Sequence, residues 1–460
     1  MKKGLLILLC LPMIGFGQNV NIPDANFKAY LVGNTAINTN GDSEIQVSEA
    51  TAFNGSIICV NMGIADLTGI AAFTSLTWLE CWNNQLTSLD VSQNIALTHL
   101  LCQANQITSL DVSQNAGLYK LDCGDNLLSS LDISNNYALY YLDCYGNGIA
   151  TLDVSEIGAL DVLLCGFNML IDLDVSQNTA LTNLDCNYNI LTTLNITQNI
   201  LLTKLSCGIN QLTSLDINQN VLLDTLFCAG NLLSSLDVSN NIALTELDCQ
   251  GNDLTSLDVS NNILLSNLVC NENQITSIDI SNNANLLFFS CTDNQITTLN
   301  LSSNIGLIIV ACGINNISSL DISNNSNLVM LYCNDNNLNY LDVRNGNNQC
   351  MIPPPVPSPP CIYGYIGLAD FNIQNNPSLS CINVDDAIWS NTNWTITGGF
   401  IDSQHYFSTN CPPPSAIQEH NTNRELLKVT DLLGRETKQT NQPLFYIYDD
   451  GTVEKRIVIE

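Results

Sequence analysis

The chain has 460 residues, of which 45% are apolar and only 12% are charged. Its 43 acidic residues outnumber the 12 basic ones, and the resulting formal net charge of −31 argues against binding to nucleic acid or to an anionic membrane. With only three histidines, His99, His405 and His420, a histidine-based active site or zinc centre is also not expected.

Residues 1–17 have the pattern of a signal peptide. Two lysines precede an apolar run from Leu5 to Phe16, and Gly15-Phe16-Gly17 provides a small-x-small cleavage site. A membrane anchor at this end is the alternative. Export would place the mature chain, which begins near Gln18, in an oxidising compartment where disulfides form.

Residues 18–57 precede a long repeat and are predicted to form its small helical N-terminal cap, with Pro23 and Asp24 at a helix start. Within this segment, residues 38–49 resemble an EF-hand calcium loop, although Ser43 stands where such loops have Gly. One interpretation is therefore a calcium site, and the other is a turn between two cap helices. The candidate calcium ligands are Asn38, Asn40, Asp42, Glu44 and Glu49.

Residues 58–348 repeat with a period of 21 residues. Thirteen cysteines follow one another at this spacing from Cys81 to Cys333, and Cys59 lies one 22-residue step earlier. Each of the thirteen is followed three residues later by Asn, and a second column of Asp or Asn runs from Asp90 to Asp342. One unit reads L-T-x-L-x-C-x-x-N-x-L-T-x-L-D-V-S-x-N-x-x.

This pattern resembles the leucine-rich repeats, in particular the bacterial 21-residue class with a second L-x-x-L-D-V half nested in each repeat. The resemblance implies a mainly β solenoid of about 14 turns, each with one short strand and a core shared with its neighbours. We expect extended backbone on both sides of each turn, little helix and slight curvature. The Asn after each cysteine should bond backbone groups as a ladder of side-chain amides.

The cysteine and aspartate columns both have structural interpretations. Cysteine fills a tight interior position as a small apolar residue, because stacked side chains that point the same way have poor disulfide geometry. A metal–thiolate stack is the alternative. In the aspartate column, hydrogen bonds from the Ser or Thr two residues later and from backbone N–H groups would stabilise the carboxylates. Calcium ions that bridge neighbouring carboxylates are the alternative.

The variable positions flank the Leu-x-Cys core of each strand. A constant scaffold beneath a varied, aromatic-rich face is how repeat proteins build binding surfaces. Trp78 and Trp82 are expected to form one patch, and Tyr141, Tyr145, Phe167 and Tyr188 another; reinforcement of strand packing is the alternative. The predicted ligand-binding face comprises Trp78, Trp82, Tyr141, Tyr145, Phe167, Tyr188 and Phe227.

Residues 349–411 are predicted to form a C-terminal cap with a proline-rich insertion. The insertion lies between Cys350 and Cys361, and a degenerate final repeat begins at Phe371. The four cysteines outside the ladder allow three pairings. We favour Cys350–Cys361, which closes the insertion, and Cys381–Cys411, which staples the cap.

Residues 412–460 comprise a linker and a small β domain, with a strand running into a turn predicted at 426–436, a hairpin around Asp450-Gly451 at 446–453 and a final strand at 455–460. This segment resembles the type IX secretion sorting domain. The resemblance rests on K-V-x-D-x-x-G-R, an aromatic strand, D-G-T and a final strand that begins with Lys. The resemblance implies transport by the type IX secretion machinery, cleavage of the tail, and release or attachment at the outer cell surface.

The leading functional hypothesis is a non-enzymatic, secreted or cell-surface repeat protein that binds an unknown protein or glycan through its variable strand face. The alternative is a structural, calcium-stabilised surface coat or spacer, which the regularity of the repeat favours. The chain has neither G-x-S-x-G nor H-E-x-x-H, so it is not predicted to be an enzyme. Calcium is the one cofactor suggested, and no nucleic-acid partner is expected.

Overall fold

The computed structural model describes residues 18–351 and 371–412, together with the strands at 426–430, 443–448 and 453–457. The chain forms two units, Met1–Asn410 and Cys411–Glu460, and each is described by itself. The predicted signal peptide (1–17) and most of the proline-rich insertion, Cys361 included, lie outside the described residues.

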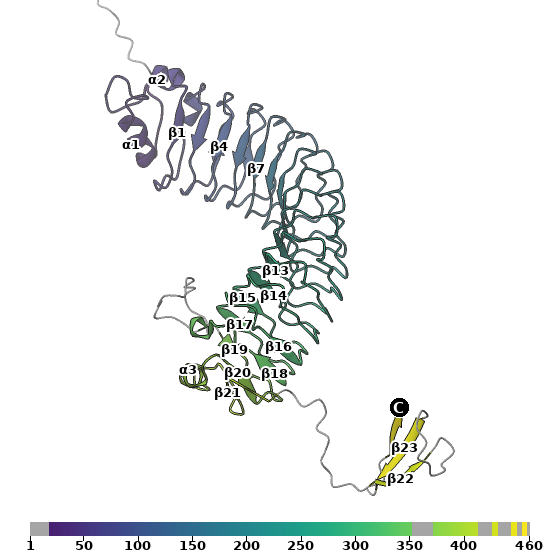
Figure 1. Cartoon of the computed structure of the whole chain (residues 1–460). Helices are drawn as coiled ribbons and strands as arrows, with labels where there is room; N and C mark the ends of the chain where they lie inside the picture. The colour runs from purple at the N-terminus through teal and green to yellow at the C-terminus, as the bar shows by residue number, and fades with distance from the viewer. Residues whose placement is uncertain (1–17, 352–370, 413–425, 431–442, 449–452, 458–460) are drawn as a thin grey trace, which may run out of the picture. The chain divides into compact units, whose positions relative to one another are not determined.

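Two short helices, α1 (Ala25–Gly33) and α2 (Val47–Ala52), cover the N-terminal end of the first unit, as predicted (Figure 1). Asp24 caps α1, because its carboxylate accepts hydrogen bonds from the backbone N–H groups of Asn26 and Phe27. Phe27 is fully buried in the same core as the first turns of the solenoid. The cap therefore closes the open end of the repeat.

A parallel sheet of fifteen strands runs through the first unit. Neighbouring strands pair in register one repeat apart, so that Leu205 lies between Leu184 and Leu226. The strands are β1 (Ser56–Ile58), β2 (Trp78–Glu80), β4 (His99–Leu101), β6 (Lys120–Asp122), β7 (Tyr141–Asp143), β8 (Val162–Leu164), β9 (Asn183–Asp185), β10 (Lys204–Ser206), β11 (Thr225–Phe227), β12 (Glu246–Asp248), β13 (Asn267–Val269), β14 (Phe288–Ser290), β15 (Ile309–Ala311), β17 (Met330–Tyr332) and β19 (Phe371–Asn372).

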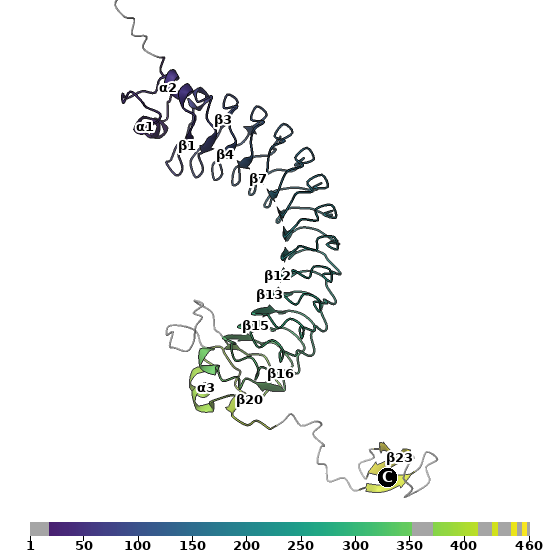
Figure 2. The ribbon, with the colours of Figure 1, turned by 45° about the horizontal axis from the view of Figure 1, so that its top comes forward.

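Strand β19 confirms the predicted degenerate final repeat and adds one turn to the fourteen that carry a ladder cysteine. The first unit curves more than expected, and the fifteen-stranded sheet lies on its inner side (Figure 2). Hydrogen bonding holds the strands at their usual close spacing, while the bulkier connections on the opposite side spread apart. We call the solvent-facing side of this sheet the strand face.

The interior is built from the central residue of each strand and the cysteine that follows it. All fourteen ladder cysteines are free and buried, which confirms their role as small core residues. Burial raises the pKa of their thiols, to about 12 for Cys312. The thiols therefore stay protonated, which makes them poor nucleophiles and poor metal ligands.

The asparagine that follows each cysteine forms the predicted amide ladder. The Nδ2 atom of Asn189, for example, donates to the carbonyls of Cys165 and Cys186, both at 3.1 Å. Its Oδ1 atom accepts from the backbone N–H of Leu170 at 2.9 Å. Each amide thus ties two consecutive turns together and uses both of its ends.

A second buried asparagine column lies on the opposite side of each turn and was not predicted as a ladder. Asn199 donates from Nδ2 to the carbonyls of Val175 and Asn178, but its Oδ1 atom has no donor among the described residues. Ile157 occupies this position in one turn and is still buried. This column therefore tolerates an apolar side chain.

The predicted aspartate column lies on the same far side of the turns. Its carboxylates accept hydrogen bonds from the backbone N–H two residues later, as from Ser92 to Asp90 at 2.9 Å. At Asp174, backbone and side-chain hydrogen bonds from Ser176 lower the pKa. The local hydrogen bonds predicted for this column are confirmed.

Regular strands form on this far side only near the two ends of the first unit. A two-stranded sheet and a four-stranded parallel sheet lie there, and the intervening turns are extended without strand pairing. These strands are β3 (Leu89–Asp90), β5 (Leu110–Asp111), β16 (Ser319–Asp321), β18 (Tyr340–Asp342), β20 (Cys381–Asn383) and β21 (Tyr406–Ser408). Single helical turns, η1 (Ile70–Ala72) and η2 (Asn348–Cys350), complete the short elements.

Helix α3 (Ala387–Asn393) leads into the C-terminal cap, where fully buried Trp394 stacks on Phe371 with ring centroids 3.9 Å apart. The predicted disulfide between Cys381 and Cys411 staples this cap. Cys350 is also in a disulfide, and its predicted partner Cys361 lies outside the described residues.

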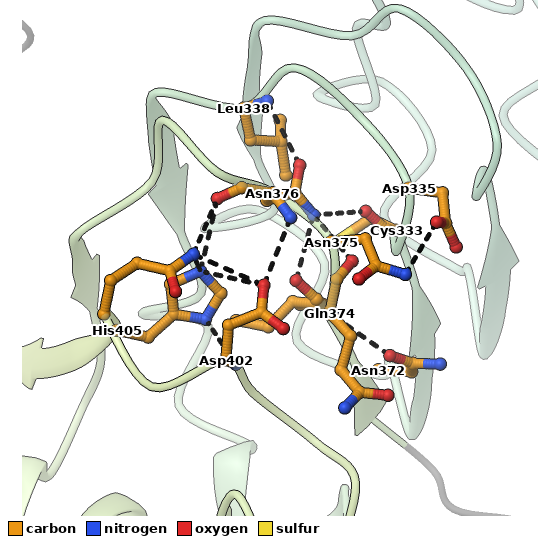
Figure 3. A network of polar contacts seen from close by, with 11 residues as sticks. Cys333, Asp335, Leu338, Asn372, Gln374, Asn375, Asn376, Asp402 and His405 are labelled. Carbon is orange, nitrogen blue, oxygen red and sulfur yellow. Dashed lines mark hydrogen bonds and ion pairs between the residues drawn. The ribbon is translucent and has the colours of Figure 1, made fainter.

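Figure 3 shows how the amide ladder ends in this cap. Asn376 donates to the carbonyl of Cys333 at 3.0 Å and accepts from the N–H of Leu338 at 3.1 Å, so it continues the ladder. His405 is buried beside it and accepts at Nδ1 from the backbone N–H of Asp402 at 3.1 Å. Burial lowers the pKa of His405, which keeps the ring neutral and suits a structural role.

The second unit contains an antiparallel sheet of β22 (Leu426–Thr430), β23 (Pro443–Tyr448) and β24 (Val453–Ile457), in agreement with the predicted small β domain. The predicted hairpin around Asp450-Gly451 falls between β23 and β24. Among the described helices of either unit, none has the length and apolar character needed to cross a membrane.

Candidate ligand-binding face

Two rows of aromatic side chains flank the first strands of the strand face. The leading row, on the side where the chain enters the strands, consists of Trp78, His99, Tyr119 and Tyr140. Trp78 stacks on His99 at 3.9 Å between ring centroids, His99 contacts Tyr119 at 6.0 Å, and Tyr119 stacks on Tyr140 at 5.1 Å. Stacked aromatic rings add stability beyond their buried area, so the row is a rigid strip.

The trailing row, where the chain leaves the strands, consists of Tyr145, Phe167 and Tyr188. Tyr145 lies 5.0 Å from Phe167, and Phe167 stacks on Tyr188 at 3.8 Å. The rings of Phe167 and Tyr188 are 43% and 46% exposed, respectively. Large, rigid aromatic rings with this exposure are the side chains that most often anchor a protein ligand.

Phe167 and Tyr188 also occupy strained backbone positions. The residue two places after each ladder cysteine has positive φ, with values of 51° at Phe167 and 52° at Tyr188. Most turns place Asn, Asp or Gly there, which tolerate this conformation, whereas bulky side chains do not. Strain of this kind is often retained at functional sites because the side chain is needed there.

A column of carboxylates lies between the two rows. The acidic column consists of Asp122, Asp143 and Asp185, each the last residue of its strand, and Asp122 pairs directly with Asp143. Burial and the neighbouring charge of Asp143 raise the pKa of Asp122 to about 7, and burial raises the pKa of Asp143 and Asp185. The protein itself therefore offsets the negative charge of the acidic column poorly.

Two buried glycines pack closely against these carboxylates. A Cβ atom at Gly124 would lie 3.2 Å from Oδ1 of Asp143, and one at Gly166 would lie 3.0 Å from Oδ1 of Asp185. Nearby, the Nζ atom of Lys120 lies 4.1 Å from the centroid of the Tyr141 ring. The region thus combines exposed rings with carboxylates, which suits recognition of a polar or cationic ligand.

The same solenoid occurs in known proteins, although no protein-family model matches the chain. The functional domain of InlJ from Listeria monocytogenes, whose structure is described as including a cysteine ladder, is 30% identical with a TM-score of 0.71. That match covers 95% of this chain and 97% of the InlJ domain. The chain belongs to the bacterial leucine-rich repeat proteins and resembles the Listeria internalins.

Other similarities are shorter or more distant. Curated internalin J of Listeria monocytogenes is 41% identical over 73 residues, which span 16% of this leucine-rich repeat chain and 8% of that protein. The internalin InlF of the same organism is 20% identical with a TM-score of 0.57, and covers 71% of this chain and 94% of its own. A leucine-rich repeat protein of Leptospira interrogans, LIC12759, is 24% identical with the same TM-score over 64% of this chain and 81% of its own. The last two similarities show the fold alone.

In this leucine-rich repeat protein, the predicted face residues are only partly brought together. Trp78 and Trp82 meet through Glu80, to which their indole N–H groups donate at 2.8 and 3.4 Å. Tyr145, Phe167 and Tyr188 form a contiguous row, as expected.

Two predicted residues lie outside the rows. Tyr141 contacts Lys120 and Asp143. Phe227 lies on β11, where its neighbours in register are Ser206 and Asp248. Tyr119, Tyr140 and the acidic column were not proposed as site residues, although their columns also vary from turn to turn.

The five predicted calcium ligands in the N-terminal cap all take part in local contacts. Glu49 accepts from the N–H groups of Thr39 and Gln46 at 2.8 and 3.0 Å, and Glu44 pairs with Lys28 at 2.6 Å. The amide of Asn38 bridges the loop by donating to the carbonyl of Asp42 at 2.8 Å.

The two remaining candidate calcium ligands are hydrogen-bonded to each other, because Asn40 donates to the Asp42 carboxylate at 3.0 Å. Among the described residues, no group of three or more His, Cys, Asp or Glu side chains is placed to hold a metal ion. These contacts give the loop a structural role, and the calcium site stays a prediction.

Proposed function

We propose that this protein is a secreted or cell-surface adhesion protein without enzymatic activity, which binds a protein or glycan ligand on the strand face of its first turns. Membership of the bacterial leucine-rich repeat proteins supports a binding role. The signal-peptide pattern at residues 1–17 supports export of the chain. The tail, which resembles a type IX sorting domain, supports transport by the type IX secretion machinery to the outer cell surface.

The observation that carries the proposal is the stacked, exposed and strained pair Phe167–Tyr188. Packing of the solenoid does not require it, since other turns place Asn or Gly at the same position. Ile209 and Ile314 share the backbone conformation and the exposure, so what sets Phe167 and Tyr188 apart is a stacked pair of exposed aromatic rings, which a ligand would bury.

The purified full chain should bind at least one component of an array of glycans and extracellular matrix proteins. The double substitution Phe167→Asn with Tyr188→Asn should weaken that binding at least about 10-fold, because it removes two anchor rings. Folding should survive, since Asn is native at this position in Asn83 and Asn375. Release of backbone strain offsets the lost stacking, so the change in stability should stay within about 1 kcal/mol.

Ile314→Asn is the matched control for this experiment. Ile314 has the same left-handed conformation, with φ of 53°, and is similarly exposed, but it lies near the other end of the solenoid. Its replacement should leave binding unchanged. Equal losses in both variants, or no loss in either, would show that the trailing row is not the binding site.

A surface coat or spacer is the second candidate function. Besides the regularity of the repeat, a stripe of exposed apolar side chains on the connecting loops favours it, because such stripes mark surfaces where copies associate. The stripe consists of Ile200, Val221, Ile242, Ile263 and Ile305, which are 47–61% exposed.

A coat stabilised by calcium predicts a rise of several degrees in melting temperature on addition of millimolar calcium, measured by calorimetry. The rise should disappear in Glu49→Gln, because that substitution removes a charged candidate ligand. Glu246→Gln, on strand β12 and away from both candidate calcium sites, is the control for the loss of one charge. An unchanged melting temperature would remove calcium from this account and leave the loop as a structural turn.

A further inference from the structure

Basic side chains are almost absent from the repeat unit. Among residues 18–412, only Lys28, Lys120, Lys204 and Arg344 are basic. Lys28 is paired with Glu44 and Arg344 with Asp342. Nearly all of the net charge of −31 therefore arises in this unit, and a partner that approaches it meets a negative potential.

Two columns of aspartates lie on opposite sides of the turns, and their carboxyl pKa values shift in opposite directions. On the far side, hydrogen bonds from Ser134 to Asp132 and from Ser155 to Asp153 lower the pKa of each carboxyl. In the acidic column of the strand face, burial raises the pKa instead, although Asp143 accepts a hydrogen bond from the N–H of Tyr145 at 3.0 Å. Only the far column is stabilised as carboxylate by its own surroundings.

A cationic side chain of the protein itself, that of Lys120, already packs on an aromatic ring beside the acidic column. Lys120 extends along the strand face onto the ring of Tyr141, with 4.1 Å between Nζ and the ring centroid. This is the geometry in which an ammonium or guanidinium group is attracted to an aromatic face. The Tyr141 hydroxyl also lies 3.5 Å from Oδ2 of Asp143, so ring and carboxylate form one surface.

The shape of the surface favours side chains over a single ion. Asp143 and Asp185 are partly exposed on the strand face, whereas Asp122 is buried. The carboxylates lie on strands β6, β7 and β9, with Leu164 of β8 between Asp143 and Asp185, rather than around one point. Such a row matches several cationic groups spaced along an extended chain, and arginine in particular, because its planar group both stacks on rings and pairs with carboxylates.

From these observations, and given the proposed function, we infer that the partner is a cationic protein segment whose arginine or lysine side chains lie on the acidic column between the two aromatic rows. A neutral glycan would leave the carboxylates uncompensated, and an acidic glycan would be repelled. The aromatic rows supply apolar contact on either side, while the acidic column selects the charge of the ligand.

The test uses a fluorescent deca-arginine peptide, with deca-lysine and a neutral chitin oligosaccharide as comparison probes, titrated into the full chain at 0.15 M salt. Deca-arginine should bind most tightly and the neutral sugar not at all. Asp122→Asn with Asp143→Asn should weaken deca-arginine binding at least about 10-fold, because the acidic column loses two of its three carboxylates.

Asp132→Asn with Asp153→Asn is the matched control. It removes the same two charges from the aspartate column of the same two turns, where Asn195 and Asn300 show that Asn is accommodated. Binding should change less than about twofold in this variant, since the charges face away from the strand face. Equal weakening in both double variants would show a diffuse charge effect and overturn the inference.

A second outcome separates this inference from the proposed function. If a neutral glycan from the array binds and its binding depends on Phe167 and Tyr188, the strand face is a binding site but its ligand is not cationic. If neither deca-arginine nor any array component binds, the inference and the binding function both fail. Circular dichroism of each variant confirms that a loss of binding does not reflect unfolding.

Discussion

Replacement of Asn189 by alanine should lower the free energy of unfolding by about 3 kcal/mol, because it removes four hydrogen bonds and leaves the buried N–H of Leu170 unpaired. The loss should destabilise both neighbouring turns, since each repeat depends on its neighbours. Urea unfolding of the full chain measures the effect as a lower midpoint.

Asn199→Ala is the matched control. Asn199 is more deeply buried than Asn189, but its side chain bonds only through Nδ2, and the carbonyls that it contacts also accept backbone hydrogen bonds. Its replacement should cost roughly 1 kcal/mol less than that of Asn189, as the presence of Ile157 in this column suggests. Equal losses in the two variants would mean that the ladder next to the cysteines has no special role in holding the turns together.

Asp122→Asn should stabilise the protein at pH 8 by roughly 2 kcal/mol and by clearly less at pH 5. Burial, followed by the charge of Asp143, raises the pKa of Asp122 from the usual 3.8 to about 7 in the folded protein. Between these values the folded chain binds a proton that the unfolded chain does not. The contribution of Asp122 to stability is therefore present at low pH and is lost as the pH rises through about 7.

Urea unfolding at pH 5 and pH 8 measures this effect. Asp132→Asn is the control, because hydrogen bonds from Ser134 lower the pKa of Asp132 and its carboxylate is already stabilised at both pH values. It should show no gain at pH 8. If Asp122→Asn is no more stable than the native protein at pH 8, the protein already offsets the negative charge of the acidic column. That result would weaken the case for a cationic partner.

The period of the sequence predicts most of the scaffold. A 21-residue spacing with Leu, Cys and Asn at fixed offsets determines which residues enter the core, and both Cys186 and Asn189 lie where the pattern requires. The two capping helices and the degenerate turn at Phe371 also follow from local sequence. Stacked identical turns leave few alternatives, so local rules are sufficient for this part of the molecule.

The site is less predictable because it depends on contacts between turns. The pairing of Tyr119 with Tyr140 is set by side-chain orientations that column spacing does not contain. The raised pKa of Asp122 depends on how deeply its neighbours bury it. The left-handed backbone at Phe167 follows from a turn whose usual residues are Asn, Asp and Gly, a signal present in the sequence but overlooked there.

Hydroxyl-radical footprinting of the full chain, with and without the ligand selected on the array, tests most directly whether the strand face of the first turns is the binding site. The exposed rings of Tyr119, Phe167 and Tyr188 should lose reactivity when the ligand binds. Tyr137 and Tyr406, which are 57% and 50% exposed outside the two rows, should not change. Protection of Tyr137 or Tyr406 without protection of the rows would place the ligand elsewhere and contradict the account.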